Sequence, residues 1–289
     1  AQIARSIASQ AGYEADETYV VEAGALAHDI GNPPFGHAGE KKLHQIFEEA
    51  GGFEGNAQTL RIMTSVEKKK SNIPGLNLTY RTMLSVVKYF HKYKEKNGTI
   101  HNKFLYNEDY NMLRSFVDKN DITVRTLDVQ IVDVADEIAY AAHDLEDGLR
   151  QKCFTIDEVL HDFYRKYGNN TSYKKLKELV NESRKDSGYL GKNSDSSIYS
   201  KLFRQELASS IINCLIKDLK ICELSQTEKD KRGTSCSSEL GFGQYADIAN
   251  GELALLTGGL ALAGYLGYTI GKTSTAASLF PEEEIKEQI

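Results

Sequence analysis

The sequence has few of the residues that mark β-rich, disulfide-linked or secreted proteins. Its 289 residues include only four prolines, and no segment sustains the alternation of β-branched and polar residues that builds a sheet. The four cysteines form no C-x-x-C pair, which argues against a cysteine-based zinc site and fits a reducing compartment. No signal-peptide pattern opens the chain. We therefore expect a mostly helical, cytoplasmic protein.

An excess of positive charge is also missing. The formal net charge is −6, which speaks against a surface built to bind nucleic acid. A charged fraction of 26% and an apolar fraction of 40% are ordinary for a globular protein, and the length allows a sizeable core. Nucleic acid is therefore not an expected partner.

The most specific stretch is A-L-A-H-D-I-G-N-P-P-F-G-H-A-G-E, at residues 25–40. The apolar and small residues before it predict a helix, with Asp16 as a plausible N-cap. Gly31 is placed to end that helix, and the two prolines after it prevent its continuation. A second helix is expected over residues 38–50, closed by two glycines.

Chemically useful side chains lie at the break between these two helices. His28 and Asp29 are adjacent at the end of the first helix, and imidazole and carboxylate groups are good ligands for a divalent cation. His37 and Glu40 are three residues apart and can share a face near the start of the second helix. Taken singly, such a His-Asp pair is more often structural than metal-binding.

The whole string is far more specific, and it resembles the HD-domain phosphohydrolases, within them the deoxynucleoside triphosphate triphosphohydrolases of the dGTPase type. This resemblance implies an all-α, HD-domain phosphohydrolase fold that uses a divalent metal ion, Mg²⁺ or Mn²⁺. It implies that the metal is held by His28, Asp29 and Asp136. His37, held by Glu40 through a hydrogen bond, becomes the candidate for moving the catalytic proton.

A second family signature is G-F-E-G-N-A-Q-T, at residues 52–59. Spacing alone favours Asn56 as the N-cap of a helix that carries Leu60 and Met63. In the resembled family the matching asparagine lies beside the substrate phosphates. Both roles can hold together, because the start of a helix attracts anions.

Two lysines are also assigned through the resemblance. Lys88 and Tyr89 look like the family's K-Y pair, with the lysine directed at the triphosphate, on an expected helix that also bears Val87 and Phe90. Without the family, an exposed lysine beside a half-buried tyrosine would be the simpler interpretation. Lys103 is similar to another family lysine through a shorter match.

The second informative segment is an expected helix over residues 124–150. An apolar stripe gathers on one side at 100° per residue and comprises Ile131, Val134, Ile138, Ala141 and Leu145. The opposite face carries Asp136, Tyr140, His143, Asp144 and Asp147. Periodicity alone predicts a core stripe backed by a solvated face. The motif D-E-I-A-Y-A-A-H-D resembles the segment that supplies the last metal-ligand aspartate, Asp136, and Tyr140 and Asp144 match positions that contact the deoxyribose.

The rest of the chain carries less chemistry. Further helices are expected over residues 157–167, 172–183 and 198–224. We expect one HD-type domain over 1–250 and an atypical segment over 251–289. Within that segment, residues 253–271 are uncharged and long enough for a transmembrane helix, and a buried hairpin is an equal alternative. Any membrane association would run through them.

The start of the chain departs from the family pattern. The family's first metal-ligand histidine would lie a few residues before Ala1, so we expect the sequence to be part of a longer chain. The main prediction is hydrolysis of dGTP or another dNTP to a deoxynucleoside and tripolyphosphate, by a homo-oligomer. The alternatives are another HD hydrolase that acts on a nucleoside monophosphate or cyclic nucleotide, a non-catalytic nucleotide-binding fragment, and a membrane-anchored interaction module.

Overall fold

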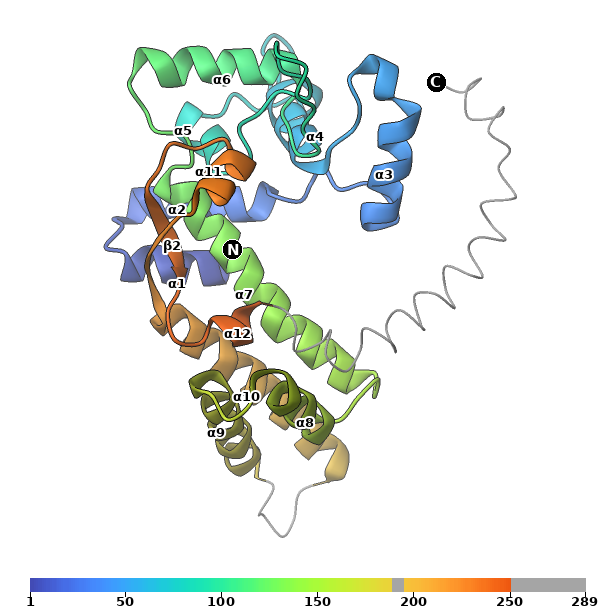
Figure 1. Cartoon of the computed structure of the whole chain (residues 1–289), viewed down its shortest axis with the longest axis vertical. Helices are drawn as coiled ribbons and strands as arrows, with labels where there is room; N and C mark the ends of the chain where they lie inside the picture. Colours follow the sequence, from blue (N-terminus) through green and yellow to red (C-terminus); the bar gives the residue numbers. More distant parts are fainter. Residues whose placement is uncertain (189–194, 251–289) are drawn as a thin grey trace, which may run out of the picture. The chain divides into compact units, whose positions relative to one another are not determined.

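The computed structural model describes residues 1–188 and 195–250 (Figure 1). Helices make up nearly all of the regular structure in these ranges, beside one antiparallel pair of strands. This confirms the predicted all-α class. The chain divides into two compact units: residues 1–136 with 219–242, and residues 137–218 with the described residues from 243 onward.

The first unit is built mainly from short helices. They are α1 (Gln2–Gln10), α2 (Ala15–Ala27), α3 (Gly36–Ile46), the 3₁₀ turn η1 (Glu48–Ala50), α4 (Gly55–Arg61), the π turn η2 (Ile62–Val66), α5 (Tyr80–Leu84), α6 (Asn107–Lys119), the first part of α7 (Leu127–Arg150) and α11 (Gln226–Arg232). The strands β1 (Leu219–Glu223) and β2 (Ser238–Phe242) complete this unit. The α6 helix was not predicted from the sequence.

An apolar cluster holds α4, α5 and α6 together. Its buried members include Leu60, Met63, Leu84, Val87, Phe90, Leu113 and Val117. Burying a side chain of this size stabilises the fold by roughly 1.5–3 kcal/mol relative to leaving it exposed. The cluster therefore fixes the segments on either side of it, among them the one that carries Lys88 and Tyr89.

Several helix ends differ from the prediction. The N-cap of α2 is Glu14, in a capping box with Glu17, so Asp16 lies inside the first turn. The N-cap of α4 is Glu54 and not Asn56, because the Glu54 carboxylate accepts from the Ala57 N–H at 2.8 Å. Negative groups are favoured at this end of a helix.

Other helices are shorter than the periodicity suggests. The expected 38–50 helix is α3 followed by the separate turn η1. The α5 helix ends at Leu84, so Val87 and Phe90 reach the core from irregular chain. The α7 stripe is as predicted: Ile131, Val134, Ile138, Ala141 and Leu145 are all buried.

The helix predicted over residues 198–224 was too long. The α10 helix (Ser196–Lys217) stops before β1, which pairs with β2 from Leu219 opposite Phe242 to Glu223 opposite Ser238. The hydrogen bonds that make residues 219–223 a strand come from a segment further along the chain, and local periodicity carries no sign of them.

The second unit holds the rest of α7 with α8 (Ile156–Tyr167), α9 (Thr171–Asp186), α10 and α12 (Ala246–Ala249). The α8 and α9 helices confirm two predicted elements with small shifts at their ends. Among the described residues, the search for an apolar helix of membrane-spanning length finds none. Residues 253–271, where such a helix was considered, lie outside the described residues, so the division into 1–250 and 251–289 stays a prediction.

Candidate metal centre

Three side chains from distant parts of the first unit converge on one point. His28 caps the end of α2, Asp29 follows it, and Asp136 comes from α7. The Nε2 atom of His28 lies 3.2 Å from Oδ1 of Asp136 and 3.4 Å from Oδ2 of Asp29. One ligand atom from each residue falls within 4.8 Å of the others. These are the three residues predicted to hold the metal.

The histidine is oriented as a metal ligand should be. Its Nδ1 lies 2.8 Å from the carbonyl oxygen of Ala25, and because a carbonyl only accepts, Nδ1 carries the proton. In a neutral ring the Nε2 lone pair then faces the carboxylates of Asp29 and Asp136. Such a set of electron-rich atoms needs a cation among them, and metal-ligating histidines commonly donate their other N–H to a carbonyl. The residues therefore fit a divalent ion.

The pKa values of the cluster shift in the directions that favour a positive charge next to the carboxylates. The hydrogen bond with Asp136 raises the pKa of His28 above its usual range. Burial alone would raise the pKa of Asp136, but the hydrogen bond from His28 and the charge of Lys88 together lower it to about 2. Asp136 is therefore an anion at any physiological pH.

Lys88 lies on the other oxygen of Asp136. Its Nζ donates to Oδ2 of Asp136 at 2.9 Å and pairs with Oδ1 of Asp133 at 3.2 Å. Burial acts to lower the pKa of Lys88, but the two carboxylates outweigh it and raise the pKa. The lysine expected to meet a triphosphate is thus a fixed cation beside the ligand cluster.

Thr59 holds the backbone that presents His28 and Asp29. Its hydroxyl donates to the carbonyl of His28 at 3.1 Å and accepts from the N–H of Gly31 at 3.0 Å. A Cβ on Gly31 would lie 2.2 Å from the main-chain nitrogen of Thr59, so only glycine allows this approach. The helix had already ended at Ala27, which gives Gly31 a packing role instead of the predicted role of ending the helix.

A second polar cluster gathers around the buried carboxylate of Glu54. Its Oε1 accepts from Nζ of Lys103 at 2.7 Å and from Nδ2 of Asn56 at 2.7 Å. Lys103 also donates to Glu40 at 2.9 Å. Burial acts to lower the pKa of Lys103, but Glu54 and Glu40 raise it overall. The structure thus brings together Glu40, Asn56 and Lys103, which the sequence predicted separately.

The predicted proton-transfer pair is arranged differently from the expectation. Glu40 is paired with Lys103, and within residues 1–188 and 195–250 it makes no hydrogen bond to His37. His37 is exposed in the first turn of α3, which starts after Phe35 in the left-handed region at φ 66°. The catalytic role of His37 stays a prediction, but the orienting hydrogen bond from Glu40 is not formed in this structure.

The remaining predicted residues are less tightly placed. Tyr89 is half-buried beside Lys88 in the irregular chain after α5. Tyr140 and Asp144 are exposed residues of α7 in the second unit. Their contact with a deoxyribose stays a prediction.

Comparison with known proteins covers the part of the chain that carries these three residues. The HD domain family model matches residues 1–141, a range that contains His28, Asp29 and Asp136. The chain is 38% identical over 257 residues to deoxyguanosinetriphosphate triphosphohydrolase-like protein 2 of Vibrio cholerae, across 89% of this chain and 59% of that protein. These matches support assignment of the chain to the HD-domain, dGTPase-like family. This is a family of phosphohydrolases.

Other dGTPase-like relatives match a shorter range. The deoxyguanosinetriphosphate triphosphohydrolase-like protein of Rhodopseudomonas palustris is 41% identical over 162 residues, across 55% of this chain and 39% of the relative. The protein of the same name from a Bradyrhizobium species is 38% identical over 194 residues, across 63% of this chain and 46% of that relative. The chain therefore spans less than two thirds of the length of these relatives.

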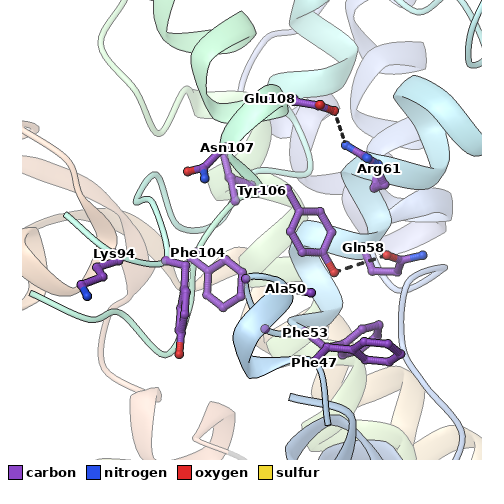
Figure 2. A pocket seen from close by; sticks show the side chains of 14 residues that line it. Phe47, Ala50, Phe53, Gln58, Arg61, Lys94, Phe104, Tyr106, Asn107 and Glu108 are labelled. Atoms are coloured by element: carbon purple, nitrogen blue, oxygen red, sulfur yellow. Dashed lines mark hydrogen bonds and ion pairs between the residues drawn. The ribbon is translucent and has the colours of Figure 1, made fainter. Parts of the chain in front are cut away.

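This dGTPase-like chain also has a hollow outside the ligand cluster (Figure 2). The pocket, of about 470 Å³, lies between residues 47–61 and residues 93–108, and aromatic side chains line both sides. At its rim Arg61 pairs with Glu108 at 2.7 Å, and the Tyr106 hydroxyl donates to Gln58 at 3.4 Å (Figure 2). None of the predicted site residues lines it.

Sequence reasoning missed a chain of charges behind Lys88. Nη2 of Arg125 donates to Asp133 at 2.6 Å, and Arg125 also pairs with the buried Glu239 of β2. Asp133 could have been found, because it lies three residues before Asp136 on one helix. Glu239 could not, because its strand was not foreseen. For Glu54 and Thr59 the signal was present in the G-F-E-G-N-A-Q-T signature.

Proposed function

We propose that this chain hydrolyses dGTP, with water, to a deoxynucleoside and tripolyphosphate in a metal-dependent reaction. The observation that carries the proposal is the convergence of His28, Asp29 and Asp136, with the cation of Lys88 on the far oxygen of Asp136. A metal-dependent nucleotide phosphohydrolase needs a metal-binding site and a neighbouring positive charge that stabilises the phosphates. The family names of the relatives support dGTP as the first substrate to test.

The metal-binding site would consist of His28, Asp29 and Asp136, and Mg²⁺ or Mn²⁺ is the expected ion. When bound, such an ion supplies Lewis acidity, which lowers the pKa of a water and polarises a phosphoryl oxygen. The Ala25 carbonyl keeps the His28 ring in the tautomer that offers Nε2. Thr59 keeps the turn in place.

The other side chains bind and move protons. Lys88 offsets the negative charge of the triphosphate, and Tyr89, Asn56 and Lys103 help to hold it. His37 gives or takes the proton of the attacking water or the leaving 5′-oxygen. Because Glu40 is held by Lys103 in this structure, the pairing of Glu40 with His37 would require Lys103 to turn toward the substrate.

The sugar would be recognised from α7. Tyr140 and Asp144 are proposed to contact the deoxyribose and to leave no room for a 2′-hydroxyl. Tyr140→Ala should then raise kcat/KM for GTP relative to dGTP, and an unchanged ratio would contradict this assignment. A homo-oligomer and a cytoplasmic location are part of the same proposal and rest on the family resemblance.

The test is a substrate panel that contains dGTP, the other dNTPs, GTP, dGMP and a cyclic nucleotide. We expect release of tripolyphosphate from dGTP in Mn²⁺ or Mg²⁺, and its loss in Asp136→Ala. Release of inorganic phosphate from dGMP would instead favour an HD hydrolase that acts on nucleoside monophosphates. Nucleotide binding without any hydrolysis would favour the non-catalytic alternative.

A further inference from the structure

A short hairpin between α5 and α6 brings two histidines and a glutamate together. Lys94 and Ile100 pair in antiparallel fashion, the Glu95 N–H donates to the Thr99 carbonyl at 2.8 Å, and Gly98 turns the chain at φ 89°. The His101 N–H donates to the Tyr93 carbonyl at 2.9 Å. The hairpin thereby sets His101 back against the start of the segment.

The three side chains form a compact donor set. The rings of His91 and His101 stack with centroids 4.0 Å apart and planes at 12°. Nε2 of His101 lies 3.8 Å from Oε1 of Glu95. One ligand atom from each of the three residues falls within 4.8 Å of the others, and all three side chains are partly shielded from solvent.

His91 is shielded and incompletely bonded. Among the described residues its Nε2 is buried and has no hydrogen-bond partner. Gly233 lies against this side of the ring: a Cβ there would come within 3.0 Å of Nε2. Burial, followed by the neighbouring His101, lowers the pKa of His91, while hydrogen bonding to the backbone of Asp230 and Lys231 acts the other way. A buried imidazole nitrogen that has no hydrogen-bond partner among the described residues retains the capacity to bind a cation.

We propose that His91, Glu95 and His101 form a second divalent-metal site, suited to Zn²⁺. Two imidazoles and one carboxylate are a ligand set that zinc accepts, with a fourth position open to water. In a tetrahedral zinc shell the ligand atoms stand about 3.3 Å apart, so ion binding would draw the three ligand atoms together and turn the two stacked rings toward a common point. The site shares no residue with the His28–Asp29–Asp136 cluster.

The site also has a structural consequence for Lys103, which comes two residues after His101. Leu105 donates its N–H to the His91 carbonyl at 2.8 Å, and Phe90 donates to the Arg232 carbonyl at 3.1 Å, so both ends of the hairpin are anchored. A metal held by His91, Glu95 and His101 would fix the hairpin between these anchors. It would thereby hold the segment that delivers Lys103 to Glu54 and Glu40.

The experiment measures Zn²⁺ binding to the metal-free 289-residue chain, in competition with a zinc-sensitive dye. An Asp136→Ala background removes one ligand of the other cluster, and Asp29→Ala serves as a second such background. We expect one Zn²⁺ per chain in both backgrounds. Adding His101→Ala should weaken Zn²⁺ binding by at least about 10-fold. Loss of a group that only hydrogen-bonds to a metal ligand already lowers metal affinity by about that factor. Glu95→Gln should weaken it less.

The matched control is His161→Ala, which removes an exposed histidine of α8 and should change nothing. Equal Zn²⁺ affinity with and without His101 would overturn the site. Trypsin tests the second part: Zn²⁺ should slow cleavage after the exposed Lys94 and Lys96, and this protection should vanish in His101→Ala. Cleavage unaffected by Zn²⁺ would overturn the effect on the hairpin. Hydrolysis of dGTP is not a readout, so an inactive chain leaves both results interpretable.

Discussion

The hydroxyl of Thr59 donates to the main-chain carbonyl of His28 across 3.1 Å. The same hydroxyl accepts from the N–H of Gly31, so one side chain of α4 satisfies two backbone groups of the turn that carries the predicted ligands. This contact joins the two stretches that carry the family resemblance, residues 25–40 and 52–59.

Thr59→Val keeps the shape of the side chain and removes the hydroxyl. It removes the partner of the buried Gly31 N–H and of the part-buried His28 carbonyl, so we expect a loss of roughly 1–3 kcal/mol in the free energy of unfolding. Metal binding should weaken in parallel, because His28 and Asp29 lose their support. Urea unfolding measures the first effect. Thr227→Val, at an exposed position of α11, is the control and should change neither quantity.

Lys88→Met should act with opposite signs on the two proposed ligands. Removal of a cation 2.9 Å from Asp136 should tighten Mn²⁺ binding by roughly 10-fold, because the ion no longer meets a fixed positive charge. The same change should raise KM for dGTP. Calorimetry and steady-state kinetics give the two numbers. A loss of both affinities in a folded variant would mean that Lys88 supports the site only structurally.

The low pKa of Asp136 predicts a dependence of stability on pH. Its folded-state value of about 2 lies below the ordinary 3.8, so the ionised carboxylate stabilises the folded chain above about pH 4. That contribution, about 2 kcal/mol, is lost as the pH falls from 4 toward 2. Urea unfolding at pH 6, 4 and 3 with a chelator present should show the loss in the wild type. If the unfolding free energy of Asp136→Asn changed with pH as steeply as that of the wild type, the pH dependence would come from another group.

Lys103→Met should lower the free energy of unfolding, because it removes the cation that pairs with the buried Glu54 carboxylate. Without the lysine, the Glu54 carboxylate keeps, among the described residues, the Ala57 N–H and the Asn56 amide as donors. We therefore expect a loss of roughly 1–3 kcal/mol in unfolding free energy. The double variant Lys103→Met with Glu54→Gln removes the unpaired charge and should recover part of it. If the double variant is less stable than the single one by the full effect of Glu54→Gln alone, the two side chains are not coupled.

Local patterns and family motifs predicted much of the fold and of the site. The apolar stripe of α7 follows from helical periodicity, and the structure buries every member of it. Periodicity could not reveal that His28 and Asp136, more than a hundred residues apart, converge, and the resemblance supplied that expectation. In the structure Nε2 of His28 lies 3.2 Å from Oδ1 of Asp136.

The features that escaped prediction depend on distant partners. Residues 219–223 continue the apolar pattern of α10 and become a strand only because residues 238–242 pair with them. Asn56 has a good capping side chain, yet Glu54 caps α4, because its carboxylate also satisfies Lys103 from another part of the chain. In the same way Lys103 takes Glu40 away from its expected partner, His37.

We infer that His28, Asp29 and Asp136 together hold one divalent ion. The most direct measurement is the equilibrium binding of Mn²⁺ to the wild type and to Asp136→Asn and Asp29→Asn, followed by the loss of the free-ion resonance signal, with circular dichroism to confirm folding. We expect one Mn²⁺ per chain in the wild type and a loss of that binding in either variant. Unchanged Mn²⁺ stoichiometry and affinity in both folded variants would contradict it.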